Sequence, residues 1–76
     1  MRGAKQTLDE TFLEIRWRCL SLAADLDRVE KNAGGADVLN ADPRIQKLRQ
    51  AIHILLDAHL DRAERVQMLF SDTTEH

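Results

Sequence analysis

The stretch LDETFLEIRWRCLSLAADLDRVEKNA, from Leu8 to Ala33, decides the fold of this chain. Its apolar side chains recur at alternating steps of four and three residues, which is the spacing of one face of an α-helix. We call this set the seam, and it consists of Leu8, Phe12, Ile15, Cys19, Leu22, Leu26, Val29 and Ala33. The unbroken series predicts a long helix that packs along its whole length against other helices.

Residues at both ends of this stretch set the expected limits of the helix. Thr7-Leu8-Asp9-Glu10 fits a capping box, in which the Thr7 hydroxyl accepts a hydrogen bond from the Glu10 amide and the Glu10 carboxylate accepts one from the Thr7 amide. Gly34-Gly35 is a typical helix end. We therefore expect a helix over about residues 8–33.

A second helical pattern starts at Asp42-Pro43, because Asp caps helices and Pro fits the first helical position. A shift of one residue interrupts its apolar series, at the point where residues 61–64 could form another capping box. Either one helix covers about residues 43–70, or the helix breaks near Leu60. Since no Gly or Pro marks a break, we expect one continuous helix. The series consists of Ile45, Leu48, Ile52 and Leu55, then Ala63, Val66 and Phe70.

The two expected helices have similar lengths and are joined by a loop over residues 34–41, which favours an antiparallel helical hairpin. We expect the 76 residues to form one domain, with flexible ends at residues 1–6 and 71–76. A single chain of this size is marginally stable, and one cysteine cannot form an internal disulfide. The prediction is an all-α hairpin that dimerises into a four-helix bundle.

The first helix carries a second apolar set, which we call the Trp17 stripe. At 100° per residue, this stripe is centred roughly 160° around the helix from the seam. A helix with two separate apolar faces has more than one neighbour, and Trp is a common interface anchor. We expect a contact with a second copy here, although Trp17 and Leu20 could instead broaden one core or be exposed singly. The candidate interface residues are Leu13, Trp17, Leu20 and Ala24, with Ile54 and Met68 as a weaker counterpart in the second helix.

The second helix is expected to carry a basic edge, which is a strip about 60° wide on a continuous helix. Doubled by a dimer axis, this edge could bind the phosphates of a nucleic acid, which gives an alternative function as a regulatory hairpin dimer. It could equally be a solvated flank with local ion pairs, such as Asp61 with Arg65. A net charge of −2 and few aromatics argue against nucleic acid. The basic edge consists of Arg44, Lys47, Arg62 and Arg65.

Residues able to carry chemistry are few, and we expect no enzyme activity, cofactor or metal. His53, Asp57 and Asp61 share one helix face, but the Glu-x-x-His spacing of bundle metal sites is absent. Cys19 lies on the seam, where a small apolar side chain fits the core. His59 is the one histidine on a core-facing side, and the sequence does not place it within hydrogen-bond distance of Cys19.

No apolar run approaches the roughly 20 residues that span a bilayer. The first ten residues contain no continuous apolar segment, so we expect no secretory signal, and a single cysteine suits the reducing cytoplasm. The expected function is that of a small non-enzymatic helical protein acting through protein–protein interaction. It would form a homodimer that presents helix faces to an unidentified protein partner, without membrane contact.

Overall fold

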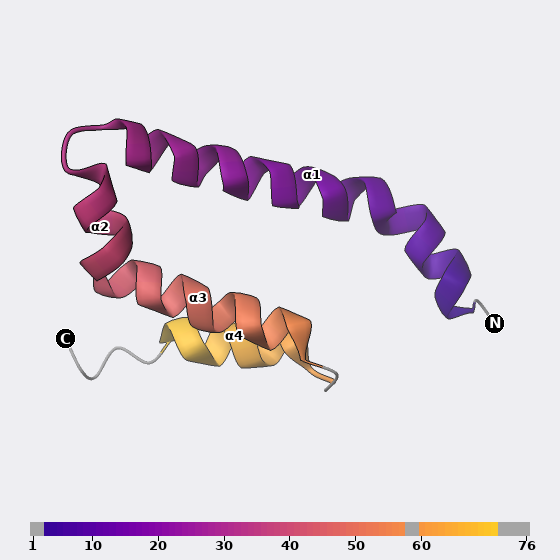
Figure 1. Cartoon of the computed structure of the whole chain (residues 1–76). Helices are drawn as coiled ribbons and strands as arrows, with labels where there is room; N and C mark the ends of the chain where they lie inside the picture. The colour runs from indigo at the N-terminus through magenta and orange to yellow at the C-terminus, as the bar shows by residue number, and fades with distance from the viewer. Residues whose placement is uncertain (1–2, 58–59, 72–76) are drawn as a thin grey trace. The chain divides into compact units, whose positions relative to one another are not determined.

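The computed structural model describes residues 3–57 and 60–71 of the chain. The described residues form four helices and no strand, which confirms the all-α prediction (Figure 1). The helices are α1 (Ala4–Lys31), α2 (Gly35–Ala41), α3 (Pro43–Leu56) and α4 (Arg62–Ser71). The chain divides into an N-terminal unit, Met1–Gly35, and a C-terminal unit, Ala36–His76. The hairpin between the first helix and the second half of the chain, and its dimer, stay predictions.

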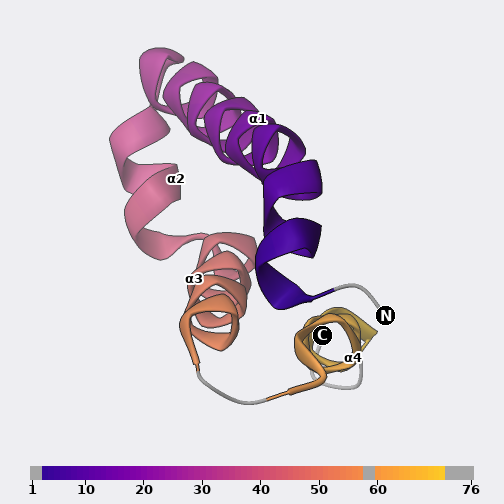
Figure 2. The ribbon, with the colours of Figure 1, turned by 90° about the vertical axis from the view of Figure 1, so that its right-hand side faces the viewer.

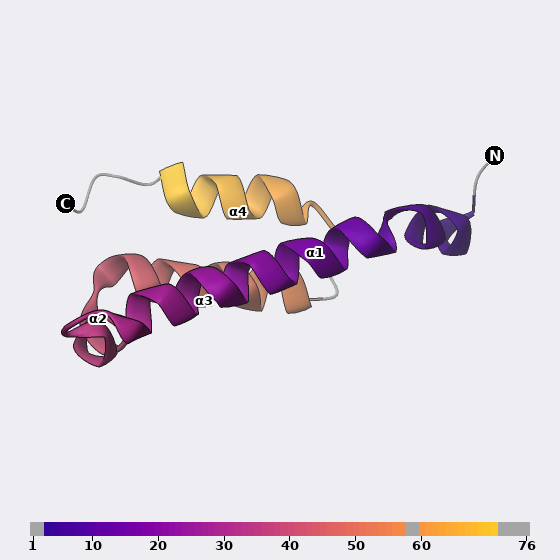
Figure 3. The same cartoon turned by 90° about the horizontal axis from the view of Figure 1, so that it is seen from above.

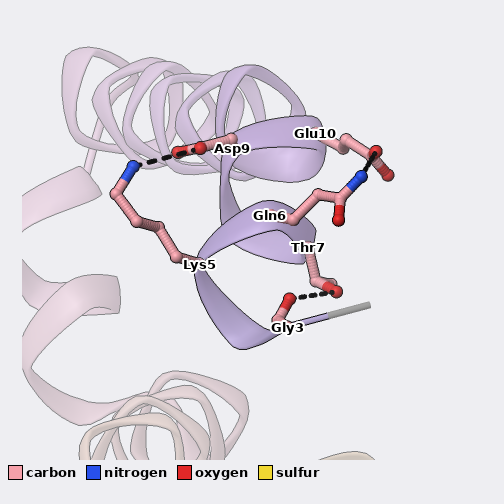
Figure 4. Close-up of polar contacts among 6 residues, drawn as sticks. All are labelled: Gly3, Lys5, Gln6, Thr7, Asp9 and Glu10. Atoms are coloured by element: carbon pink, nitrogen blue, oxygen red, sulfur yellow. Dashed lines mark hydrogen bonds and ion pairs between the residues drawn. The ribbon is translucent and has the colours of Figure 1, made fainter. Parts of the chain in front are cut away.

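Helix α1 begins at Ala4, earlier than expected, and the capping box at Thr7 is wrong. Gly3 is the N-cap and makes no side-chain capping bond. The Thr7 amide donates to the Gly3 carbonyl at 3.1 Å, so Thr7 already lies inside the helix. Glu10 instead accepts from the Gln6 side chain at 3.4 Å, one turn back (Figure 4). Ala4 to Gln6, expected to be flexible, are therefore helical, whereas residues 1–2 and 72–76 lie outside the described residues.

Helix α1 bends in its N-terminal part (Figure 1). Two threonines on this part donate their hydroxyls to carbonyls one turn back. The Thr7 hydroxyl donates to Gly3 at 3.3 Å, and the Thr11 hydroxyl donates to Thr7 at 2.8 Å. A hydroxyl that shares a helical carbonyl in this way tilts the carbonyl outward and favours a bend. Thr7, which the sequence offers as a cap, and Thr11 therefore account for the curvature of α1.

The helix end at Gly34-Gly35 is confirmed. Helix α1 ends at Lys31, and Gly34 adopts a φ of 77°, which is the left-handed region that glycine enters without strain. Gly35 lies so close to the carbonyls of Val29 and Glu30 that a Cβ at this position would overlap them. The first glycine therefore supplies the backbone conformation, and the second allows the close approach.

The prediction of a loop over residues 34–41 is wrong, because this segment contains helix α2. The next prediction is confirmed: Asp42 caps α3, with Pro43 at the first position. The Asp42 carboxylate accepts from the Arg44 amide at 2.8 Å and from the Arg44 guanidinium at 3.0 Å. These hydrogen bonds favour the ionised form and lower the pKa of Asp42 to about 2.

A single helix over residues 43–70 is wrong, because α3 ends at Leu56 and α4 begins at Arg62. Asp57 is extended, with φ −67° and ψ 151°, and Asp61 has a positive φ of 66°. Cations from α4 bind the end of α3. Arg62 donates to the Leu55 carbonyl at 3.1 Å and to the Asp57 carbonyl, and Arg65 pairs with the Asp57 carboxylate at 2.8 Å. Polar side chains of α4 thus stabilise the break between α3 and α4, where the sequence has no Gly or Pro.

Helix α4 folds back along α3, as the two perpendicular views show (Figures 2 and 3). The Lys47 ammonium donates to the Leu69 carbonyl at 3.2 Å, and so binds the carbonyl end of α4. The contact follows the predicted series only in part, since Ile45, Leu48 and Val66 are half-buried while Ile52, Leu55 and Phe70 are exposed. Ala51 of α3 is buried, with an exposed fraction of 8%. The buried or half-buried apolar residues of this unit are Leu39, Ile45, Leu48, Ala51, Ile54, Val66 and Leu69.

The ion pair between Arg65 and Asp57 should stabilise the C-terminal unit. Replacing Arg65 by Met removes a charge-assisted bond between half-buried groups, and we expect the free energy of unfolding to fall by about 1 kcal/mol in chemical denaturation. Arg28→Met is the matched control, because Arg28 pairs with Asp25 on the exposed surface of α1. This control should change the free energy by about 0.3 kcal/mol or less. Equal effects of the two substitutions would contradict the assignment.

The Asp42 cap should make α3 sensitive to acid. Because the pKa of Asp42 is lowered from 3.8 to about 2, its stabilising contribution is complete above the ordinary pKa and is lost as the pH falls toward 2. Circular dichroism between pH 5 and pH 2 should therefore show a steeper loss of helix for the wild type than for Asp42→Asn, which keeps a capping oxygen but cannot titrate. Parallel titration curves would exclude this role.

Candidate functional site

The seam from Leu8 to Val29 lies along α1 on one helical face, as predicted, whereas Ala33 lies beyond the end of the helix. A helix has no interior of its own, and α1 is the only helix described in the N-terminal unit. The exposed fractions of its large exposed seam side chains range from 52% at Phe12 to 36% at Val29, while Leu26 is half-buried. Within this unit the seam is therefore an apolar surface that requires a partner helix.

The structure also brings the Trp17 stripe together on α1. Its four residues lie within the helix, and Leu13 and Trp17 are exposed over 73% and 67% of their surface. Leu20 and Ala24 continue the stripe toward the C-terminus of α1 and are exposed too. Large apolar side chains gathered on one face are typical of interaction sites. The role of the stripe as an interface stays a prediction.

The two residues expected as a weaker counterpart of the stripe in the second helix lie on separate helices. Ile54 belongs to α3 and is half-buried, and Met68 belongs to α4 and is 65% exposed. The break between α3 and α4 means that they do not share the face of one helix. Ile54 therefore contributes to the packing of its own unit, which the series of apolar residues in the sequence did not indicate.

The basic edge is not a strip along one helix, because Arg44 and Lys47 lie on α3 and Arg62 and Arg65 on α4. Each of the four cations donates to an acceptor of its own chain: Asp42 for Arg44, Leu69 for Lys47, Leu55 and Asp57 for Arg62, and Asp57 for Arg65. The expected local pair of Arg65 with Asp61 is replaced by the pair with Asp57. These cations hold helix ends, a role that sequence spacing did not indicate.

The residues able to carry chemistry form no cluster in the part of the chain that the structure describes. Over residues 3–57 and 60–71, no group of three or more His, Cys, Asp and Glu side chains could hold a metal ion. Cys19 is a free, exposed cysteine on α1. His59 lies outside the described residues, so its predicted position relative to Cys19 is not described. No helix among the described residues has both the length and the apolar character needed to cross a membrane.

Comparison with known proteins finds no family model, no curated protein and no solved structure that matches this chain. Its function is therefore argued from its own residues. The feature that combines position, exposure and chemistry is α1, with the seam on one face and the Trp17 stripe on another.

Proposed function

We propose that this chain is a small non-enzymatic helical protein that acts through protein–protein interaction, as a homodimer that presents helix faces to a partner. The observation that carries the proposal is the exposure of two separate apolar faces on α1, the only helix described in its unit. Removing apolar surface from water contributes about 25 cal/mol per Å², so each face favours association. Two faces roughly 160° apart need two partners.

Several features of the described residues support a binding role over catalysis. Asp57, which the sequence places on one helix face with His53 and Asp61, is bound by Arg65. Cys19 has Ile15, Arg16, Leu22 and Ala23 one turn away on its own helix, and none of these side chains is a base that could activate a thiol. We propose the cytoplasm as the location, because an exposed single thiol suits a reducing compartment.

Two measurements test the proposal: the mass of the protein in solution and the proteins that it retains as immobilised bait. Sedimentation at micromolar concentration should give the mass of a dimer. As immobilised bait in an extract of the native host, the wild type should retain a protein that Trp17→Ser retains at least tenfold less. Leu56→Ser is the matched control, since Leu56 is also a highly exposed apolar residue but lies at the end of α3. A monomeric mass together with equal retention by all three baits would refute the proposed function.

The nucleic-acid alternative gains no support from the basic edge, whose cations are engaged within the chain. We expect no shift of RNA or DNA in a gel assay at low salt, where phosphate contacts are strongest. If a shift is seen and Lys47→Glu abolishes it, while the charge-matched Lys31→Glu on α1 does not, the basic edge binds nucleic acid and the alternative replaces our proposal.

A further inference from the structure

The long second helix that the sequence assigned as partner is divided into α3 and α4, and neither matches the length of the seam. From Leu8 to Val29 the seam extends roughly 32 Å at 1.5 Å per residue, whereas the 14 residues of α3 extend about 21 Å and the 10 residues of α4 about 15 Å. Part of the apolar surface of α3 is already used by α4. Among the described helices, α1 with its 28 residues is the one that matches the seam in length. A second α1 is therefore the best-fitting partner for the seam.

We propose that α1 pairs with α1 of a second copy along the seam, antiparallel, with the twofold axis at the level between Leu20 and Ser21. This proposal rests on the proposed function, since it names the surface through which the homodimer forms. In this register the seam residues from Phe12 to Val29 meet one another, because the steps of four and three read the same in both directions about the axis. The layers are Cys19 with Leu22, Ile15 with Leu26, and Phe12 with Val29, whereas Ala33 lies beyond the end of α1.

Side-chain size supports this register. Phe12, the largest seam residue, meets the smaller Val29 of the other copy. Alternation of large and small side chains fills an interface evenly. A parallel, in-register pair would instead place Phe12 against Phe12 and crowd that layer.

Charge at the margins of the seam also favours the antiparallel pair. Arg18 precedes Cys19 and Asp25 precedes Leu26, and in an antiparallel pair these two positions face each other across the interface. Arg18 of each copy therefore meets Asp25 of the other, which gives two such pairs. In a parallel pair, Asp25 would instead meet Glu30. The present partners of these residues are Glu14 for Arg18, at 3.1 Å, and Arg28 for Asp25. Both pairs are highly exposed, so exchanging them costs little.

On the other side of the seam, the antiparallel pair brings Asp9 of one copy near Glu30 of the other at each end. This repulsion is weakened because Lys5 already pairs with Asp9 at 3.2 Å and Lys31 follows Glu30. With the seam occupied, the Trp17 stripe lies on the far side of each α1. It then remains available for the protein partner of the dimer.

Single-cysteine crosslinking tests the register. On a Cys19→Ala background, Phe12→Cys and Val29→Cys chains are mixed and treated with a short bismaleimide. In the antiparallel pair, residue 12 lies level with residue 29 of the other copy, whereas two copies of either residue are roughly 25 Å apart along the axis. We expect covalent dimers from the mixture and at least tenfold fewer from either variant alone. Dimers from Phe12→Cys alone would overturn the register in favour of a parallel pair.

The Trp17 stripe provides the matched control pair, Leu13→Cys mixed with Ala24→Cys. Crosslinks confined to this pair, in a chain that sediments as a dimer, would overturn the seam while leaving the proposed function intact. A chain that sediments as a monomer and crosslinks with neither pair would overturn self-association in both proposals. The two failures are therefore distinguishable.

A charge exchange on the otherwise unchanged chain avoids substitutions in the seam. We expect Arg18→Glu to weaken dimerisation about fivefold, since two pairs change at once. Combining Arg18→Glu with Asp25→Arg should restore dimerisation, although each substituted side chain then has a like charge one turn away within α1, at Glu14 and Arg28. Arg16→Glu is the control, because Arg16 faces Ala23 in this register and should have less than a twofold effect. Failure of the double variant to recover would overturn the proposed pairing.

Discussion

An α-helix has no interior, so the apolar side chains of α1 can leave water only by contact with another helix. This constraint governs the N-terminal unit, where the seam and the Trp17 stripe lie on the same 28-residue helix. A helix with one apolar face can be satisfied by one neighbour in its own chain. A helix with two such faces is better suited to connecting neighbours, and this geometry is the basis of the proposed role in protein–protein interaction.

The C-terminal unit meets the same constraint differently, by folding α4 back on α3. The polar residues at the turn make this possible. Arg62 and Arg65 bind the carbonyls and the carboxylate at the end of α3, and Lys47 binds the carbonyl end of α4. Helix ends leave carbonyls without partners inside the helix, so cations placed there stabilise two short helices in place of one long one. The break leaves α3 and α4 much shorter than α1.

The sequence and the structure agree where a signal is local. The Asp42 cap, the Pro43 start and the end at Gly34-Gly35 depend on backbone conformation and on bonds within a few residues, and all three were predicted correctly. The capping box at Thr7 failed because a helix can begin earlier whenever the preceding residues tolerate it, and Ala4 to Gln6 are good helix formers. A break near Leu60 is the less favoured alternative from the sequence, because no Gly or Pro marks it. In the structure Arg62 and Arg65 bind Leu55 and Asp57 across the break, seven and eight residues away.

The sequence by itself determined that the protein is helical, that α1 is long, and that α1 has two apolar faces, because periodicity and composition act along one helix. Only the tertiary structure decided that α4 packs on α3, that Ile54 is half-buried in its own unit, and that the basic edge holds helix ends. These outcomes depend on contacts between residues far apart in the chain, which helical periodicity does not encode. The seam illustrates both levels: the sequence defines its residues, and the lengths of the other helices indicate which partner fits.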